Sequence, residues 1–301
     1  MTISLRKYEP NDLYKVRDFI IRTQSLLGHP NNWGIDRWEF VPFFQETRNG
    51  TLEQWQSRIG IWEDENGDIA AVACDDGDVY FLLDSLEPGE QLVQELFEYA
   101  EEKLLIFEPG QLCTRNALAI TAGMKGIERI AESRGYTRGP GEDTIMSLTL
   151  DRDFQVFLPQ GYVIKTGEEV DSRTKALGHI MAFDYAGTSD ADKTLLHYGN
   201  IAKAPDYRAG LELSVLNTAG EVVSFCSLWW DEANKVATLE PVGTHKAYRR
   251  KGLGKAVIYE GLNRLKTLGA VKVYVGSGQT FYRKIGFEPE VSMYRWIQSK
   301  R

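Results

Sequence analysis

The sequence predicts an α/β chain of two tandem domains, each built on a mostly antiparallel central sheet (a mixed sheet of the α+β kind) flanked by helices. Its length of 301 residues is about twice that of an ordinary single domain. Each half contains three short β-rich segments joined by turns, followed by a long amphipathic helix. Landmarks in the two halves are separated by a nearly constant number of residues, which is typical of an internal duplication.

The composition limits the cellular setting and the classes of partner. The chain has 35 basic and 43 acidic residues, a net charge of −8, which disfavours general binding to nucleic acid or to an anionic membrane. Its 43% hydrophobic content is enough to form a core. There is no apolar run of membrane-spanning length and no signal-peptide pattern at the N-terminus. We therefore expect a cytoplasmic protein.

The cysteines and histidines show no metal-site spacing. Three cysteines, Cys74, Cys113 and Cys226, lie far apart without a CxxC pair, which fits a reducing compartment. The four histidines are scattered through the chain. We therefore expect no bound metal.

The first half contains three β-rich segments, at residues 60–63, 68–74 and 78–83. Short turns of Asp, Glu, Asn and Gly separate them, so they are expected to form an antiparallel meander. An amphipathic helix over 92–105 follows, then a short strand, a shorter helix and a closing strand over 144–150.

The second half shows the same order of elements. Its three β-rich segments are residues 211–216, 221–230 and 235–242. A helix of about four turns begins near Gly252, because leucines and valines recur there at helical spacing. A short strand over 272–275, a shorter helix and a closing strand over 292–298 complete the half.

Three pairs of landmarks indicate a duplication. The glycines of the first meander turn, Gly67 and Gly220, are 153 residues apart, the pairs Gly135-Tyr136 and Gly286-Phe287 are 151 apart, and the closing strands are 148 apart. A repeat of about 150 residues explains these offsets, and chance matching of common turn signals is the alternative. Residues 151–160 are predicted to link a domain of residues 1–152 to a domain of residues 153–301.

The loop before the second-half helix is strongly basic. Between residues 241 and 258 there are no acidic residues and five basic ones, Lys246, Arg249, Arg250, Lys251 and Lys255. A helix N-terminus offers unpaired backbone N–H groups and partial positive charge, and glycines allow a phosphate to approach closely. The loop is therefore predicted to hold a pyrophosphate; the alternative is a basic surface turn before an ordinary helix.

Two common phosphate motifs do not fit this loop. A Walker A loop requires Gly and Ser or Thr at places that hold Arg249 and Ala256. A dinucleotide-binding fingerprint requires a third glycine where Val257 stands, within a parallel βαβ unit.

Two sequence elements resemble the GNAT (GCN5-related N-acetyltransferase) superfamily. The first is Arg/Gln-x-x-Gly-x-Gly/Ala after a meander strand, which Arg249, Gly252 and Gly254 match. The second is a tyrosine four residues before a Gly-Phe pair, which Tyr282 and Gly286-Phe287 match. The resemblance covers roughly residues 161–298 and implies that acetyl-CoA binds in an opening between the fourth and fifth strands of this half.

The resemblance implies a role for each matched position. The backbone N–H groups from 249 to 254 would hold the CoA pyrophosphate, with Lys255 just beyond; these residues are Arg249, Arg250, Lys251, Gly252, Leu253 and Gly254. The strand edge at Val242, Gly243 and Thr244 would pair with the pantetheine amides. The N–H of Val242 would donate to the thioester carbonyl oxygen, which gains charge during attack.

Two side chains are candidate acid and base. The resemblance implies that Tyr282 protonates the departing thiolate, and packing of its ring is the alternative. Glu240 matches a place where a base removes the amine proton, directly or through water. It would share a face with Val242 if no bulge intervenes, and pairing with a nearby cation is the alternative. The family often has an Asn where Val275 stands here, so Gln279 or backbone groups would substitute in contacts to the pantetheine arm.

The first half lacks these features. At the place that corresponds to the pyrophosphate-binding loop, residues 84–91 carry Glu87 and Glu90, which would repel a pyrophosphate. Ala131 stands in the place of Tyr282. This half is therefore predicted to be a degenerate copy without catalytic function.

The expected activity is transfer of an acetyl group from acetyl-CoA to a primary amine, on a small molecule, in the second domain. A non-catalytic acetyl-CoA sensor or interaction module, and acetylation of a protein N-terminus or lysine, are the alternatives. The expected partners are acetyl-CoA and the amine, with no nucleic acid or membrane and with homodimerisation left open. Aromatic segments are candidate contributors to the acceptor site, although core packing is their more common role; they are residues 33–44, 183–185, 197–198 and 229–230.

Overall fold

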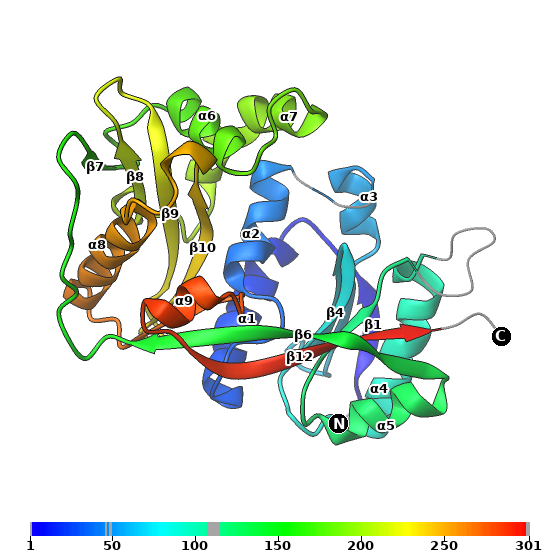
Figure 1. Cartoon of the computed structure of the whole chain (residues 1–301). Coiled ribbons are helices and arrows are strands. Elements are labelled where there is room, and N and C mark those ends of the chain that lie inside the picture. Colours follow the sequence, from blue (N-terminus) through cyan, green and yellow to red (C-terminus); the bar gives the residue numbers. More distant parts are fainter. Residues whose placement is uncertain (1, 46, 48–49, 107–114, 299–301) are drawn as a thin grey trace. The chain divides into compact units, whose positions relative to one another are not determined.

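The computed structural model of the chain describes residues 2–45, 47, 50–106 and 115–298 (Figure 1). The chain divides into two compact units, and both are discontinuous in sequence. Unit 1 consists of Met1–Trp38, Thr47–Ile145 and Pro289–Arg301, and unit 2 of Glu39–Glu46 and Met146–Glu288. The predicted mixed α/β class is confirmed, because each unit contains parallel and antiparallel strand pairs with helices packed on them.

Unit 1 contains most of the first half of the chain. Its strand order is β1-β2-β3-β4-β5-β12. Its strands are β1 Ser4–Lys7, β2 Gly60–Glu63, β3 Ile69–Asp76, β4 Asp78–Leu83, β5 Leu118–Thr121 and β12 Glu288–Gln298. Its helices are α1 Asp12–Leu27, α3 Leu52–Ser57, α4 Glu90–Tyr99 with the π-helical turn η1 Ala100–Leu104, and α5 Lys125–Ser133, together with the start of α2 Ile35–Phe44.

Unit 2 contains the second meander and its helices. Its strand order is β6-β11-β10-β9-β8-β7. Its strands are β7 Val163–Thr166, β8 Glu212–Leu216, β9 Val222–Asp231, β10 Val236–Thr244, β11 Lys272–Val275 and the end of β6 Tyr136–Thr149. Its helices are α6 Ser172–Ala182, α7 Ser189–His197, α8 Leu253–Thr267 and α9 Thr280–Lys284, with short 3-10 turns η2 Tyr198–Lys203, η3 Ala209–Leu211 and η4 Lys246–Tyr248.

Both predicted meanders are present. Strands β2, β3 and β4 pair antiparallel in sequence order, and so do β8, β9 and β10. Each meander then continues into one parallel pair, β4 with β5 and β10 with β11. Each sheet is therefore mostly antiparallel, and the parallel pair marks the point where a helix crosses from one strand to the next.

The closing strands are exchanged between the halves of the chain. In unit 2, β11 pairs antiparallel with residues 146–149 of β6, a strand that follows the first-half elements in sequence. In unit 1, β5 pairs antiparallel with residues 293–296 of β12, at the end of the second half. The compact units are therefore a different division of the chain from residues 1–152 and 153–301, which remain our proposal for the extent of the two repeats.

Side chains of β9 contribute to the core of unit 2 on both faces of the sheet. Cys226 and Leu228 belong to a buried cluster with residues of α8, and Phe225 packs in a separate cluster with Ala182 of α6. Because successive side chains of a strand point to opposite faces, α8 and α6 cover opposite faces of the sheet. Figure 1 shows α8, in orange, lying along β8, β9 and β10.

The aromatic segment at residues 33–44 is mostly helical. Residues 35–44 form helix α2, with Pro42 inside it. The helix begins in unit 1, and its residues from Glu39 onward belong to unit 2. There Phe44 packs in a buried cluster with Ala176 and Tyr198. Burial of these rings stabilises a helix that the proline would otherwise disfavour.

Three further features limit the chemistry of the described residues. Cys74 and Cys226 are free and buried, and Cys113 lies outside the described residues. Over residues 2–298, apart from the short gaps, no group of three His, Cys, Asp or Glu side chains lies close enough to bind a metal. None of the helices in the same part of the chain combines the length and the apolar character that crossing a membrane requires.

Candidate active site

Strand β10 bends away from β11 at a β-bulge. Its parallel pairing with β11 runs from Val236 to Thr238 and stops there. Its pairing with β9 shifts register between Leu239 and Val242, so that two residues, Glu240 and Pro241, lie opposite one residue of β9. A bulge bends the strand that carries it. Residues 239–244 therefore stay next to β9 along one edge of the strand. Along the other edge they do not pair with β11.

The backbone groups of this open edge can be assigned from the strand register. The N–H of His245 donates to Val223 of β9 at 3.0 Å. Because the edge to which backbone groups point alternates along a strand, Gly243 also faces β9, and the N–H groups of Val242 and Thr244 face the open edge. The edge from Val242 to Thr244 can therefore pair with an extended ligand in the way that another strand would.

The loop after β10 ends at a helix without a side-chain cap. Gly252 precedes α8 with φ of 82°, a left-handed conformation that glycine adopts without strain. Arg250 also has positive φ. Among the described residues, no acceptor is bonded to the N–H groups of Leu253, Gly254 or Lys255. A Cβ at Gly254 would lie 3.2 Å from Thr244 Oγ1, so the helix starts directly beside the end of β10.

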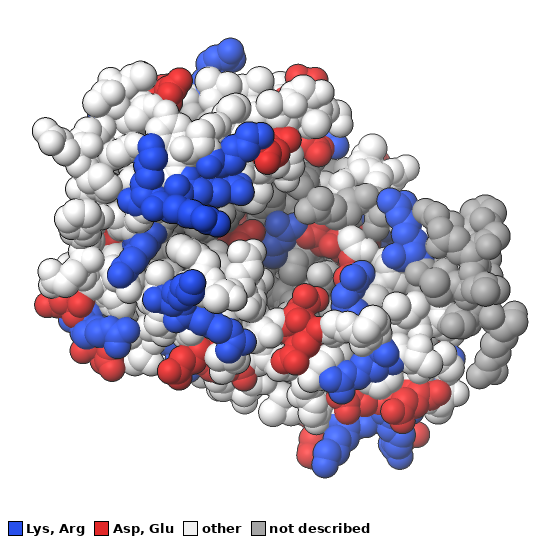
Figure 2. Space-filling model, viewed as in Figure 1, with Lys and Arg blue, Asp and Glu red and all other residues white. Residues whose placement is uncertain are grey.

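Five cations lie close together in sequence, between residues 246 and 255. Figure 2 shows a cluster of Lys and Arg side chains on one face of the molecule. Arg249 holds the loop, because its guanidinium donates to the carbonyls of Thr244 at 3.0 Å and Ala182 at 3.3 Å. Lys246 pairs with Asp184 at 2.9 Å. Lys251 donates to Tyr162 Oη at 3.3 Å. Arg250 has no hydrogen bond or ion pair within the described part of the chain, so its charge is available to a ligand.

The backbone N–H of Arg249 differs from its neighbours. It donates to the carbonyl of Lys246 at 3.4 Å, so the run of N–H groups available to an anion begins at Arg250. The remaining donors are close together in sequence, at the positive end of the α8 dipole and next to cationic side chains. This set of groups fits a diphosphate, and the open strand edge fits the amides of the pantetheine arm.

Tyr282 lies in α9 and belongs to the core of unit 2. Its side chain is 8% exposed, and its ring makes an edge contact with Phe287 at 5.7 Å between centroids. Within the described part of the chain its hydroxyl makes no hydrogen bond. Burial, with smaller contributions from the negative charge of Glu240 and from Cys226, raises the pKa of Tyr282 well above its usual value. Tyr282 therefore keeps its proton at neutral pH.

Glu240 lies within the bulge. The prediction that it shares a sheet face with Val242 required a strand without a bulge, and this requirement is not met. With a bulge between Leu239 and Val242, the simple two-residue alternation that would put Glu240 and Val242 on one face does not apply. Glu240 is nevertheless close enough to Tyr282 for its charge to raise the tyrosine pKa. Gln279 stands at the N-cap position of α9, makes no side-chain bond to the helix and is exposed.

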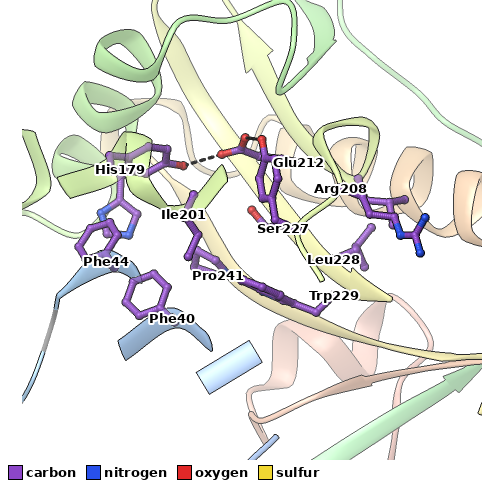
Figure 3. Close-up of a pocket in the computed structure, with 13 residues that line it drawn as sticks. Phe40, Phe44, His179, Ile201, Arg208, Glu212, Ser227, Leu228, Trp229 and Pro241 are labelled. Atoms are coloured by element: carbon purple, nitrogen blue, oxygen red, sulfur yellow. Dashed lines mark hydrogen bonds between the residues drawn. The ribbon is translucent and has the colours of Figure 1, made fainter. Parts of the chain in front are cut away.

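A narrow pocket lies next to the bulge, entirely within unit 2 (Figure 3). We call it the aromatic pocket. Its rings come from Phe40, Phe44, His179, Tyr198, Tyr207 and Trp229. The rest of its lining is Ile201, Arg208, Leu211, Glu212, Ser227, Leu228 and Pro241. The indole Nε1 of Trp229 donates to the carbonyl of Glu240 at 2.7 Å, which connects the pocket wall to the bulge.

The carboxylate of Glu212 in this pocket already has three bonding partners. Lys175 Nζ lies 2.6 Å from one carboxylate oxygen, to which Tyr207 Oη donates at 2.5 Å, and Tyr198 Oη donates to the other at 3.0 Å. Burial and the Glu212 charge raise the pKa of both tyrosines. The carboxylate and the ammonium group neutralise each other, so the pocket carries no net charge from this pair.

Residues 209–289 match the family model of the acetyltransferase (GNAT) domain. A tandem GNAT protein from the clavulanic acid biosynthesis pathway matches with a TM-score of 0.62 and 13% identity, over 99% of this chain and 98% of that one. The chain has a tandem GNAT architecture. A GCN5-related N-acetyltransferase from Sphaerobacter thermophilus matches with a TM-score of 0.61 and 18% identity, over 99% and 95% of the two chains.

At these identities the structural matches establish the fold of the chain alone. No similar sequence was found among curated proteins. The residues that sequence reasoning missed are those of the aromatic pocket that come from separate segments, above all Glu212 and His179. Four of its rings, Phe40, Phe44, Tyr198 and Trp229, do lie in the aromatic segments considered for the acceptor site. Trp230 instead belongs to the core.

Unit 1 fills the equivalent opening with its own side chains. Parallel pairing of β4 with β5 stops at Tyr80 and Ala119. Beyond it, Asn31 accepts from the N–H of Leu83 at 3.2 Å and donates to the Leu83 carbonyl at 3.3 Å. Asn32 donates to the Ala119 carbonyl at 2.8 Å. The strand edge that is open in unit 2 is therefore occupied in unit 1.

Proposed function

We propose that unit 2 of this tandem GNAT protein transfers an acetyl group from acetyl-CoA to a primary amine of a small molecule. The observation that carries the proposal is the open edge of β10, which leads directly to an uncapped helix start surrounded by cations. An extended amide-containing arm that ends in a diphosphate matches this sequence of groups. Few other metabolites combine the two.

Each group of the site has a part in holding the cosubstrate. The N–H groups of residues 250–255 bind the diphosphate, with Arg250 and Lys255 contributing charge. The edge from Val242 to Thr244 pairs with the pantetheine amides. Gly243 is needed for its size, because a Cβ there would lie 2.5 Å from the ring of Phe225. Gln279, exposed beside α9, is a further polar contact to the arm.

Acetyl-CoA supplies an acetyl group that is activated as a thioester. The N–H of Val242 donates to the carbonyl oxygen, where negative charge develops during attack by the amine. Glu240 accepts the proton of the amine, directly or through a water molecule. Tyr282, which burial keeps protonated, gives its proton to the sulfur as the carbon–sulfur bond breaks.

A screen for thiol release tests this proposal. The full chain is mixed with acetyl-CoA and panels of simple amines, amino acids, polyamines and aminoglycosides, and free CoA thiol is measured over time. We expect release that depends on one class of amine, together with saturable binding of acetyl-CoA measured by calorimetry. Tight binding of acetyl-CoA without release from any amine would contradict the enzyme proposal and favour a sensor. Release with peptide amines alone would contradict the small-molecule acceptor.

A further inference from the structure

We propose that the aromatic pocket binds an uncharged apolar group of the acceptor, so that the substrates are hydrophobic primary amines. This inference rests on the proposed function and narrows it to one class of amine. It excludes polyamines, amino sugars and other acceptors that carry charge or many hydroxyl groups close to the reacting nitrogen. Its support comes from the walls of the pocket, its charge balance and its contact with the bulge.

The walls of the pocket are apolar and closely spaced. Phe40 and Phe44 stack on each other at 4.5 Å between centroids, and Figure 3 shows them on one side of the pocket, with Trp229 and Pro241 on another. The cavity between the walls has a volume of about 20 Å³, so it is a narrow slot. A slim group, such as an alkyl chain or the edge of an aromatic ring, fits such a slot.

The charge balance of the pocket disfavours a cationic occupant. Glu212 is the acidic residue of the lining, and its carboxylate already binds Lys175 and two tyrosine hydroxyls. A second cation would meet the buried Lys175 ammonium and would displace one of these bonds. The charge of Arg208, another lining residue, is balanced by Glu232 at 3.2 Å. An uncharged group avoids both costs.

His179 adds one hydrogen-bonding atom without charge. It is 4% exposed, and its Nδ1 has no hydrogen-bond partner among the described residues. Burial lowers the pKa of His179 to about 4, so the ring is neutral at physiological pH. The rings of Phe44 and Tyr198 lie within 6.0 Å of it, centroid to centroid. One polar atom on an otherwise apolar occupant can therefore be paired at this end of the pocket.

The pocket adjoins the reacting groups through the bulge. Pro241 lines the pocket and precedes Val242, whose N–H faces the open edge of β10. Trp229 lines the pocket and holds the carbonyl of Glu240 at 2.7 Å. An acceptor with its apolar group between these two side chains has its nitrogen next to Glu240. The apolar group would therefore position the amine for attack.

The first test is a ladder of straight-chain amines. With saturating acetyl-CoA and the full chain, kcat/KM is measured for ethylamine, butylamine and hexylamine, and for 1,6-diaminohexane. We expect kcat/KM to rise about fourfold per methylene, as expected for burial of a CH2 group. The diamine has the length of hexylamine but a charge at its far end, and we expect it to react at least about 100-fold less efficiently than hexylamine.

The second test narrows the pocket. Ser227→Val adds apolar bulk on β9, where a β-branched residue suits a strand. We expect the ratio of kcat/KM for hexylamine over ethylamine to fall at least about tenfold, because a filled slot cannot accept the chain. Leu196→Ala is the matched control, since Leu196 is 73% exposed on α7 and does not line the pocket; it should keep the wild-type ratio. The acetyl-CoA affinity of both variants confirms that unit 2 is folded.

The outcomes separate this inference from the proposed function. A flat ladder, or equal turnover of hexylamine and the diamine, overturns the hydrophobic acceptor while the acetyltransferase proposal stands. A wild-type ratio in Ser227→Val with intact acetyl-CoA binding overturns the assignment of this pocket. Absence of thiol release from every amine overturns the acetyltransferase proposal and the acceptor inference with it.

Discussion

The two units differ most at the connection from the meander to the following helix. In unit 1, β4 pairs with β3 without any register shift, and α4 begins with Glu90 at its positive end. Glu90 pairs with Arg129 at 2.9 Å. In unit 2, β10 bulges, its edge is open, and α8 begins among five cations without a cap. The same succession of elements therefore has an occupied strand edge in unit 1 and an open strand edge in unit 2.

This difference shows how little of the fold decides whether it can bind a cosubstrate. Asn31 bonds to both backbone groups of Leu83, and these two bonds take the place that an extended ligand would occupy in unit 2. The sign of charge at the helix start then reinforces the difference, because carboxylates repel a diphosphate. The scaffold is common to both units, and function depends on one strand edge and one helix start.

The largest expected effect comes from separating the halves. Residues 153–301 expressed alone lack the end of β6, whose Met146 and Leu148 are buried in unit 2, and lack Phe44. Loss of these contacts removes several times the roughly 2 kcal/mol that one buried side chain contributes, which is comparable to total stability. We expect no cooperative unfolding transition by near-UV circular dichroism. A sharp transition from the isolated half would show that the exchanged segments are dispensable.

The second largest expected effect is on acetyl-CoA affinity, through the loop that is proposed to bind the diphosphate. Gly252→Asp should weaken acetyl-CoA binding at least about 100-fold in calorimetry, because it adds an anion where the diphosphate binds. Gly252→Asn is the control for shape, since both residues tolerate positive φ; its loss should be much smaller. Gly89→Asp, before the equivalent helix of unit 1, should leave binding unchanged. Equal losses from the Asp and Asn variants would assign the effect to the backbone rather than to charge.

The third effect concerns the acid. Tyr282→Phe should lower kcat by about one to three orders of magnitude, with acetyl-CoA affinity nearly unchanged. The substitution removes only a hydroxyl that has no hydrogen bond within the described part of the chain, so the packing against Phe287 is retained. Single-turnover kinetics with hexylamine would measure it. Unchanged kcat would remove Tyr282 from the chemistry and leave it a packed aromatic ring.

The smallest expected effect is a difference between the two units in how the unfolding free energy depends on pH. Burial raises the pKa of Asp36, in unit 1, to about 6 and lowers that of His179, in unit 2, to about 4. A raised carboxyl pKa gives stability that is complete below the unfolded value and lost as pH rises through 6. A lowered histidine pKa gives stability that is present above the unfolded value of 6.5 and lost as pH falls through 4.

The two groups should therefore respond to pH with opposite signs. Between pH 7 and pH 4, the unfolding free energy of the wild type relative to Asp36→Asn should rise by about 2 kcal/mol, and relative to His179→Phe it should fall by about 3 kcal/mol. Denaturant titrations of the three proteins at half-unit pH steps would measure both. Parallel curves for the wild type and either variant would show that the residue concerned is not titrating in this range.

The sequence predicted local elements well and non-local ones poorly. The turns and the periodicity of the second meander located β8, β9 and β10 within about two residues, and α8 begins one residue after Gly252. The partners of the closing strands were not predictable, because β6 and β12 carry similar patterns and each pairs far from its neighbours in sequence. The bulge had a readable signal in Pro241, since proline inside a strand favours one.

The candidate site divides in the same way. The loop and Tyr282 are contiguous motifs, and the spacing within each is visible in the sequence. The aromatic pocket combines Phe40 and Phe44 with residues more than one hundred positions away, such as His179 and Trp229, so no local pattern reports it. Glu212 was hidden for another reason: a carboxylate in a strand gives no sign of the lysine and tyrosines that bind it.

The strand exchange has a consequence for recombination. A chimera that joins this protein to a relative at the repeat boundary near residue 152 would separate β6 from β11, with which it shares a sheet. Breakpoints between 145 and 146 and between 288 and 289 instead keep each compact unit whole, provided that residues 39–46 travel with unit 2. Shuffled libraries designed on those junctions would let new acceptor pockets be installed without dividing either unit.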